Sequence, residues 1–206
     1  MSGEKIGLYY AKKMLEMGKV SQQLEANIES ALSGAQQAAD AQVVSFFEIA
    51  LGTWDIPDCT PPLFVLREVL LQKSYGDFIA GNADHLTWLC DALARCGKQT
   101  EHQAPRLLAM AAVCNMFATS ALAERLRTTP HLVEELLRNM ALSSILSDTP
   151  SERELAAALV YNFTLGPLAA PEVAEYAEQR IEKAMLEEQG FDEEFEYRLL
   201  LALGHM

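Results

Sequence analysis

Two stretches of the chain, RLLAMAAVCNMF at residues 106–117 and RELAAALVYNFT at residues 153–164, resemble each other at a displacement of 47 residues. The identical positions pair Arg106 with Arg153, Leu108 with Leu155, Ala109 with Ala156, Ala111 with Ala158, Val113 with Val160, and Asn115 with Asn162. A helical unit with a period in the forties is typical of armadillo and HEAT arrays, in which each unit buries its apolar face against its neighbours. The sequence therefore predicts an all-α fold, built as an armadillo-like helical repeat superhelix.

The spacing of apolar residues elsewhere in the chain also favours helices. Apolar residues recur three and four positions apart, and the alternation that is typical of strands is hard to find. We predict helices at residues 4–32, 36–51, 61–73, 84–96, 104–118, 119–128, 130–146, 151–165, 171–188 and 192–204. Residues 52–62 hold three prolines and are expected to form a loop or a sharp bend. Residues 151–154 (SERE) are predicted to be a capping box at a helix start.

The chain is expected to have two parts. Residues 1–35 carry an amphipathic pattern of their own, which fits either an N-terminal capping helix or a partly mobile arm. Residues 36–206 contain the repeats and are predicted to form the armadillo-like domain.

Composition narrows the function classes. The 206 residues are 50% hydrophobic, which is ample for a buried core. No apolar run approaches the roughly 20 residues that cross a bilayer, and the first residues lack the features of a secretory signal. We therefore expect a soluble protein of the cytoplasm or nucleus, with reduced cysteines and with Cys114 as a small buried hydrophobe. Residues 147–206 hold 13 acidic and four basic residues within a net charge of −13, which argues against binding to nucleic acid or membrane.

Catalytic motifs are missing from the sequence. It has no glycine-rich phosphate loop, no H-E-x-x-H pair and no nucleophile elbow, and no two cysteines have the C-x-x-C spacing of metal sites. The four histidines are scattered over predicted loops and helix ends. We expect a protein that is not an enzyme and that needs no cofactor or metal.

The paired asparagines are the strongest candidates for a binding role. Asparagine is unfavourable inside a helix and on apolar surroundings unless it is hydrogen-bonded. Asn115 shares a helix face with Ala111, and Asn162 shares one with Ala158, so a ligand main chain could approach each amide. Alternatively, each asparagine bonds a neighbouring helix end or a turn and stabilises the stack. Arg106 and Arg153 lie half a turn out of phase and are expected to be helix-start or surface groups.

Four segments resemble successive motifs of the PUL domain over residues 43–206: PPLFVLREVLL, RLLAMAAVCNMF, ERELAAALVYNFTLG and FEYRLLLALGHM. This domain occurs in phospholipase-activating protein and in some thioredoxin-like proteins. The resemblance implies an armadillo-like array whose groove binds the C-terminal tail of the valosin-containing AAA ATPase, in ubiquitin-dependent protein degradation. On the matching motif positions it assigns the groove residues Arg67, Asn115, Asn162 and Arg198.

The sequence thus supports two hypotheses of function. In the first, an adaptor binds an acidic or aromatic C-terminal tail, with Asn115 and Asn162 on the peptide main chain and Arg67 and Arg198 on its carboxylates. In the second, the chain is a helical-repeat scaffold or assembly subunit that uses its outer face or its N-terminal helix. An exposed apolar patch within residues 4–20 would favour the second hypothesis.

Overall fold

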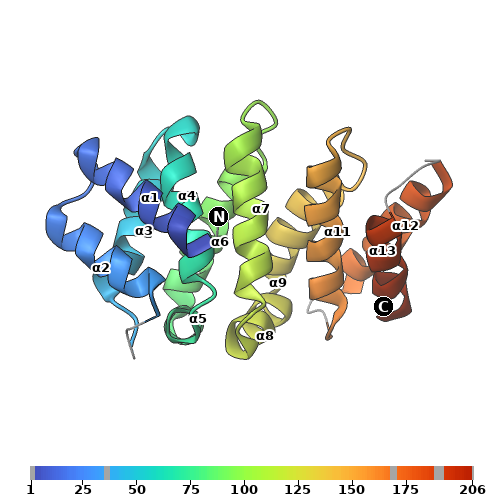
Figure 1. The fold of residues 1–206 in the computed structure, drawn as a ribbon. Helices are drawn as coiled ribbons and strands as arrows, with labels where there is room; N and C mark the ends of the chain where they lie inside the picture. The colour runs from blue at the N-terminus through green and yellow to red at the C-terminus, as the bar shows by residue number, and fades with distance from the viewer. Residues whose placement is uncertain (1–2, 35–37, 168–170, 188–192, 206) are drawn as a thin grey trace. The chain divides into compact units, whose positions relative to one another are not determined.

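The computed structural model describes residues 3–34, 38–167, 171–187 and 193–205 (Figure 1). Every regular element in these ranges is helical, and they contain no strand. The all-α prediction is therefore confirmed. The chain divides into two compact units, residues 1–122 and residues 123–206, each with its own buried side chains.

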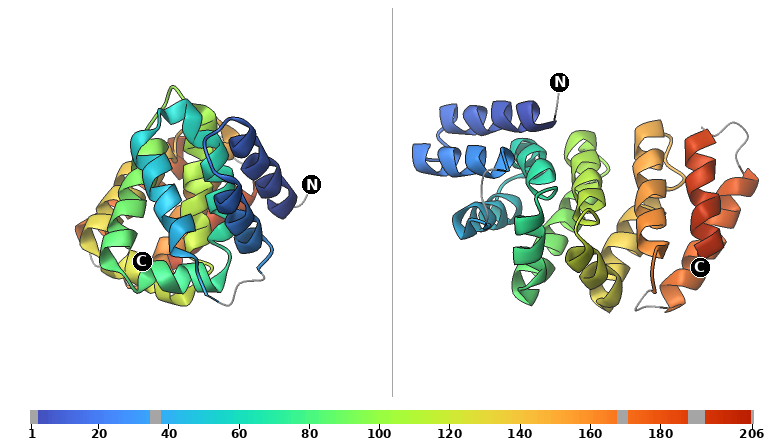
Figure 2. Two further views of the ribbon diagram at one scale, coloured as in Figure 1. Left: turned by 90° about the vertical axis from the view of Figure 1, so that its left-hand side faces the viewer. Right: turned by 60° about the horizontal axis from the view of Figure 1, so that its bottom comes forward.

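The first unit is built from short helices joined by tight turns. Its elements are α1 (Gly3–Glu16), α2 (Gln22–Leu32), α3 (Ala41–Thr53), the 3-10 helix η1 (Ile56–Cys59), α4 (Thr60–Val69), α5 (Lys73–Ala80), α6 (Ala83–Gly97), α7 (Gln103–Met116) and the first residues of α8 (Ser120–Thr128). Helix α4 packs against both α1 and α7, and α6 packs against α3 and α7 (Figures 1 and 2). Leu63, Leu66 and Met110 are buried in the resulting core.

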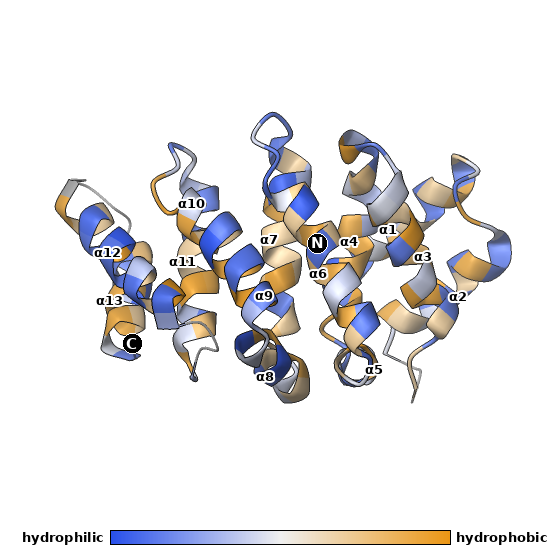
Figure 3. Cartoon of the chain, turned by 180° about the vertical axis from the view of Figure 1, so that it is seen from behind, coloured by the Kyte–Doolittle hydropathy of each residue, from blue (hydrophilic) through white to orange (hydrophobic). Residues whose placement is uncertain are grey.

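The second unit contains the remainder of α8 and the C-terminal helices. Its other elements are α9 (Pro130–Leu132), the π-helical segment η2 (Val133–Ala141), α10 (Leu142–Ser144), α11 (Pro150–Thr164), α12 (Pro171–Glu187) and α13 (Glu193–His205). Helix α11 packs against η2 and α13, with Phe163 and Phe195 buried in the core. Hydrophilic residues run along α12, which packs through Val173, Ala177 and Ile181 (Figure 3).

Helices α7 and α11 carry the two matching sequence stretches. The displacement of 47 residues in the sequence maps Gln103, the first residue of α7, onto Pro150, the first residue of α11. Each of these helices packs against the helical segment that precedes it, α7 against α6 and α11 against η2. Both matching stretches therefore form a helix that packs against an earlier helical segment.

The prediction of one helix over residues 4–32 is wrong. The chain forms α1 and α2, which are separated at Gly18, whose φ of 67° lies in the left-handed region. Glycine adopts this conformation without a steric cost and commonly ends a helix in this way. Ser21 then caps α2, because its hydroxyl oxygen accepts a hydrogen bond from the Leu24 N–H at 3.2 Å.

Helix α5 is absent from the predicted helices, because the glycine at position 76 and the polar residues around it have low helix propensity. Tertiary packing overrides this preference, since Tyr75 and Ile79 are buried at 1% and 2% exposure. The bend expected at residues 52–62 contains η1 and the first residues of α4.

The capping box predicted at residues 151–154 is not formed. Helix α11 begins earlier, at Pro150, with Thr149 as its N-cap residue. Proline fits the first helical position, because its fixed φ suits the helix and its missing N–H would have no partner there. Ser151 is consequently already inside the first turn.

Among the described residues, no single helix is long and apolar enough to cross a bilayer. In the part of the chain that the structure describes, one sharply bent helix pair, α7 with α8, reaches that length and apolarity when the two helices are taken together.

Candidate functional site

The predicted residues Arg67 and Asn115 meet in the first unit, where α4 packs on α7. The Asn115 side-chain Nδ2 donates a hydrogen bond to the main-chain carbonyl of Arg67 at 2.7 Å. Arg67 lies in the last turn of α4, where helical carbonyls lack partners within the helix. Asn115 therefore bonds a neighbouring helix end, which is one of the two roles considered from the sequence.

The Arg67 guanidinium is engaged within the first unit. Its Nε and Nη2 donate to Glu68 Oε1 at 3.0 and 2.8 Å, and its side chain is 25% exposed. The guanidinium also lies 5.5 Å from the centre of the Phe64 ring, which stacks on Tyr10. This arginine thus has a carboxylate and an aromatic face as partners before any ligand arrives.

The predicted residues Asn162 and Arg198 share a pocket in the second unit. The pocket has a volume of about 420 Å³ and lies between α11 and α13. Helix α11 lines it with Ala158, Tyr161 and Asn162, and α13 lines it with Glu194, Tyr197, Arg198 and Leu201. Ala158 and Asn162 face the same hollow because they are four residues apart on one helix, as the sequence predicts.

Asn162 differs from Asn115 in its hydrogen bonding. Its main-chain carbonyl accepts from Arg127 Nε at 3.0 Å and from Nη2 at 2.6 Å, so Arg127 stabilises the C-terminal end of α11. Burial lowers the pKa of the Arg127 guanidinium from its ordinary value. No hydrogen bond joins the Asn162 side-chain amide to another described residue. Its donors and its acceptor are consequently available to a ligand in the pocket.

Arg198 is held at the pocket by a neighbour on its own helix. Its Nε donates to Glu194 Oε1 at 2.8 Å, and Nη2 lies 2.8 Å from the same oxygen. The Arg198 and Glu194 side chains are 34% and 60% exposed, and an exposed pair of this kind on one helix contributes only about 0.3–0.5 kcal/mol. A carboxylate brought by a ligand can therefore compete for the guanidinium.

Sequence reasoning missed the two tyrosines of the pocket, Tyr161 and Tyr197. Each directly precedes a predicted residue in the sequence, which is the only signal that could have identified them. Tyr197 is 57% exposed, and the Tyr161 ring lies 6.1 Å from the His205 ring. Tyrosines that are at least partly exposed supply a large contact area together with a polar hydroxyl, which is common where proteins bind peptides.

The four predicted residues form two pairs, one in each compact unit. Arg67 and Asn115 belong to residues 1–122, whereas Asn162 and Arg198 belong to residues 123–206. The pair in the first unit is largely satisfied internally, and the pair in the second unit lines a pocket. The second pair is the stronger candidate for ligand contact.

The predicted roles of the other repeat residues are partly corrected by the structure. Arg153 is a helix-start group, because its Nη1 donates to the Ser147 carbonyl at 2.7 Å. Arg106 holds the equivalent fourth position of α7 and is also a helix-start group, but it is buried at 8% exposure and is not a surface group. Cys114 is only partly buried, because it lies beside Asn115 at the end of α7 rather than on the helix's core face.

Two buried thiols, Cys59 and Cys96, lie close together in the first unit. A hydrogen bond from Cys96 and the charge of Arg95 lower the pKa of the Cys59 thiol, against the opposing effect of burial. Arg95 Nη2 lies 3.7 Å from Cys59 Sγ and also donates to the Trp54 carbonyl at 3.1 Å.

The described residues contain no group of three or more histidine, cysteine or acidic side chains placed to hold a metal ion.

A family model of the PUL domain matches residues 6–206, which is nearly the whole chain. The chain belongs to the PUL domain family. No curated protein matches it. The match begins inside α1, so this PUL domain includes both N-terminal helices, whereas the motifs recognised in the sequence begin at residue 43.

Membership of the PUL family indicates what kind of ligand the pocket between α11 and α13 suits. A PUL domain is a protein-interaction domain rather than a catalytic one. The pocket of this PUL domain offers an amide, an arginine and two phenol rings. These groups suit the binding of a peptide main chain and its carboxylates.

Proposed function

We propose that this PUL domain is a non-enzymatic peptide-binding adaptor that binds the C-terminal tail of the valosin-containing AAA ATPase in ubiquitin-dependent protein degradation. The observation that carries the proposal is the pocket between α11 and α13, which brings Asn162 and Arg198 together. The identity of the tail follows from the PUL family resemblance. The pocket supplies the chemistry that such a tail requires.

Asn162 would hold the main chain of the tail. An amide side chain can donate a hydrogen bond to a peptide C=O and accept one from a peptide N–H. It can therefore bind an extended peptide independently of the peptide's side chains. The small Ala158 one turn earlier leaves room for that chain. Arg127 keeps the end of α11 in place through the Asn162 carbonyl.

Arg198 would bind a carboxylate of the tail, and the two tyrosines would contact its side chains. The planar guanidinium can pair with both oxygens of a carboxylate at once, which gives a geometric preference that a lysine lacks. Tyr161, Tyr197 and Leu201 form the apolar part of the same pocket. An acidic tail with an aromatic residue therefore suits both parts of the pocket.

Arg67 and Asn115 would form a separate peptide contact within the first unit. Asn115 is partly exposed, and its bond to Arg67 uses only one of its two N–H donors. We further propose that the helix pairs form an armadillo-like helical repeat superhelix. The site of action would be the cytoplasm or the nucleus.

Calorimetric titration of the ATPase's tail peptide tests the proposal. We expect Arg198→Ala to weaken the affinity by at least about tenfold, since a hydrogen bond to a charged group is worth about 1.5–3 kcal/mol. Asn162→Ala should weaken it by about two- to tenfold, since a hydrogen bond to the neutral main chain is worth about 0.5–1.5 kcal/mol. Arg138→Ala is the matched control, because Arg138 pairs with Glu134 at 2.8 Å in the same four-residue spacing but lies outside the pocket. Unchanged affinity in both pocket variants would remove the pocket from the proposal.

A further inference from the structure

Helix α1 and the turn after it form a basic segment in an acidic protein. Residues 3–19 contain four lysines and two glutamates, whereas the whole chain has a net charge of −13. Lys5, Lys12, Lys13 and Lys19 are all exposed. Two large apolar or aromatic side chains of the segment are exposed as well, Tyr9 at 58% and Met17 at 50%.

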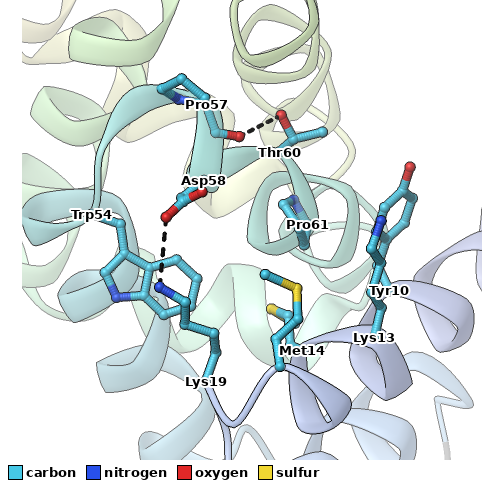
Figure 4. A pocket seen from close by; sticks show the side chains of 10 residues that line it. Tyr10, Lys13, Met14, Lys19, Trp54, Pro57, Asp58, Thr60 and Pro61 are labelled. Atoms are coloured by element: carbon cyan, nitrogen blue, oxygen red, sulfur yellow. Dashed lines mark hydrogen bonds and ion pairs between the residues drawn. The ribbon is translucent and has the colours of Figure 1, made fainter.

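A pocket of about 240 Å³ lies beside this segment, in the first unit (Figure 4). Its apolar walls are formed by Tyr10, Met14, Met17, Trp54, Pro57 and Pro61. The ammonium groups of Lys13 and Lys19 lie at the pocket, together with one carboxylate, that of Asp58. An apolar side chain would fit between these walls with its acidic neighbours close to the lysines.

Lys19 and Trp54 also line a second hollow of about 570 Å³. This second hollow is lined in addition by Leu24, Phe46 and Ile49, and Ile49 is 61% exposed. Because both hollows share Lys19 and Trp54, they adjoin each other along one face of the first unit. We call this face the Lys19–Trp54 surface; it comprises Tyr10, Lys13, Met17, Lys19, Trp54, Phe46 and Ile49.

The frame of this surface is fixed by the fold. Gly18 sets the turn between α1 and α2 through its left-handed φ of 67°. Arg95 donates hydrogen bonds to the carbonyls of Leu51 and Trp54 and thereby stabilises the C-terminal end of α3. The Trp54 ring meets the Phe46 ring edge to face with the centres 6.0 Å apart. The walls of the hollows are consequently formed before a partner binds.

The Lys19 side chain, in contrast, is held loosely. Its Nζ lies 4.9 Å from the centre of the Trp54 ring and 3.5 Å from Asp58 Oδ2, and the Lys19 and Asp58 side chains are 36% and 51% exposed. An ion pair this exposed contributes only about 0–1 kcal/mol. A carboxylate from another protein can therefore replace Asp58 at little cost.

We propose that the Lys19–Trp54 surface is a second docking site of this protein, which binds an acidic segment of a partner protein with one aromatic or long aliphatic anchor in each hollow. The lysines supply the charge that selects an acidic segment, and the aromatic and methionine side chains supply apolar contact area. The site lies wholly in the first unit. It is therefore distinct from the pocket between α11 and α13.

The structure favours a protein partner over an anionic membrane. A membrane-binding amphipathic helix inserts its apolar face into the bilayer. In α1 that face is already buried within the protein, since Gly7, Ala11 and Met14 pack in the first unit. The exposed side of α1 offers three lysines, two glutamates and a single tyrosine, and the apolar area lies in the adjoining hollows.

Three synthetic peptides test the proposal by calorimetry. The first is acetyl-Asp-Glu-Phe-Asp-Glu-Leu-Asp-Glu-amide, the second has lysines in place of its acidic residues, and the third has alanines in place of its two anchors. We expect the first peptide to bind at least about tenfold more tightly than either of the others. Trp88→Phe removes the other tryptophan, so that the fluorescence comes from Trp54 alone. In this background, the Trp54 fluorescence emission should change only with the first peptide.

Two variants and one matched control locate the binding. Lys19→Glu and Met17→Ala should each weaken binding of the acidic peptide, the charge reversal by about tenfold. Lys98→Glu makes the same charge change elsewhere on the first unit and should leave the affinity unchanged. These titrations use an Arg198→Ala background, so that the pocket between α11 and α13 does not contribute to binding of the acidic peptide. Equal binding of the acidic and the lysine peptides, or equal effects of Lys19→Glu and Lys98→Glu, would overturn the proposal.

Phosphatidylserine vesicles provide the remaining comparison. If the protein co-sediments with these vesicles and Lys19→Glu abolishes this, while the acidic peptide does not bind, the surface is a lipid site and the proposal is wrong. We expect no Lys19-dependent vesicle binding.

Discussion

Asn115 donates from its side-chain amide to the main-chain carbonyl of Arg67, across the contact between α7 and α4. The neighbouring carbonyls at the end of α4 accept from main-chain N–H groups, since Leu70 bonds Leu66, Leu71 bonds Glu68 and Gln72 bonds Val69. Asn115 supplies the partner that the Arg67 carbonyl lacks in this series. Within the described residues, Asn162, its counterpart in the repeat, has no such bond from its side chain.

Substitution of the two asparagines should therefore separate stability from binding. We expect Asn115→Ala to lower the free energy of unfolding by about 1–3 kcal/mol, because it leaves a partly buried carbonyl without a partner. Asn162→Ala should cost less than about 0.5 kcal/mol. Urea denaturation followed by circular dichroism measures both. Equal losses of stability would show that the single bond to Arg67 does not distinguish the two residues.

Glu194 should act as a competitor for ligands at Arg198. Its carboxylate oxygen accepts a hydrogen bond from the Arg198 guanidinium at 2.8 Å. We expect Glu194→Gln to raise the affinity for an acidic tail peptide by about two- to fivefold, because the weakened internal pair no longer opposes binding. Calorimetry at low and high salt checks this, and the gain should shrink at high salt.

The control for this prediction is Glu196→Gln on the same helix. Glu196 is exposed and does not line the pocket. The Glu196→Gln substitution removes the same negative charge as Glu194→Gln. A gain of equal size in both variants would mean that the net charge of the unit, rather than the pair with Arg198, governs the affinity.

Much of the fold follows from local sequence signals. The repeat in residues 106–117 and 153–164 identifies α7 and α11, because apolar spacing and a fixed displacement report helices that bury the same face. The break at Gly18 and helix α5 were missed for physical reasons. A glycine is compatible with a helix interior or a helix end, and only the packing around residues 17–21 and 73–80 decides between them.

The candidate site was predictable only in part. The spacing of Ala158 and Asn162 on one helix predicts that they share a face, and both line the pocket. Nothing in the sequence indicates that Asn115 bonds a helix end and that Asn162 does not, because the partner carbonyl comes from a distant helix. The tyrosines and Glu194 enter the site for the same reason, through the packing of α13 on α11.

The stability of the protein should fall at alkaline pH through Cys90. Burial, with a smaller effect of the Asp91 charge, raises the pKa of the Cys90 thiol above its ordinary range. In the unfolded chain this thiol loses its proton near pH 8.5, whereas the folded protein retains it. The stability linked to the neutral thiol is therefore complete below about pH 8.5 and is lost as the pH rises toward the higher folded pKa.

Cys90→Ala should remove this dependence. Its free energy of unfolding should be lower than that of the native protein at pH 7, because a buried side chain becomes smaller. Above pH 8.5, the difference in free energy of unfolding between the native protein and Cys90→Ala should shrink by about 1.4 kcal/mol per pH unit. Urea denaturation at several pH values gives the two curves, and the difference between them cancels the titration of Tyr75 and Cys96. Parallel curves would contradict the prediction.

Gly76 marks a close approach within the first unit. A Cβ atom placed on Gly76 would lie 2.3 Å from Thr119 Oγ1 and 2.7 Å from Thr119 Cβ, so either α5 or the start of α8 would have to move. We expect Gly76→Ala to destabilise the protein by about 1–3 kcal/mol. In Gly204→Ala, on α13, the new methyl group would meet nothing within 4 Å. This control should be neutral or stabilising by up to about 1 kcal/mol, because alanine has the higher helix propensity. In thermal denaturation, the melting temperature should therefore fall in Gly76→Ala, and in Gly204→Ala it should stay the same or rise. A melting temperature that falls equally in both variants would show that loss of glycine, rather than the contact with Thr119, is the cause.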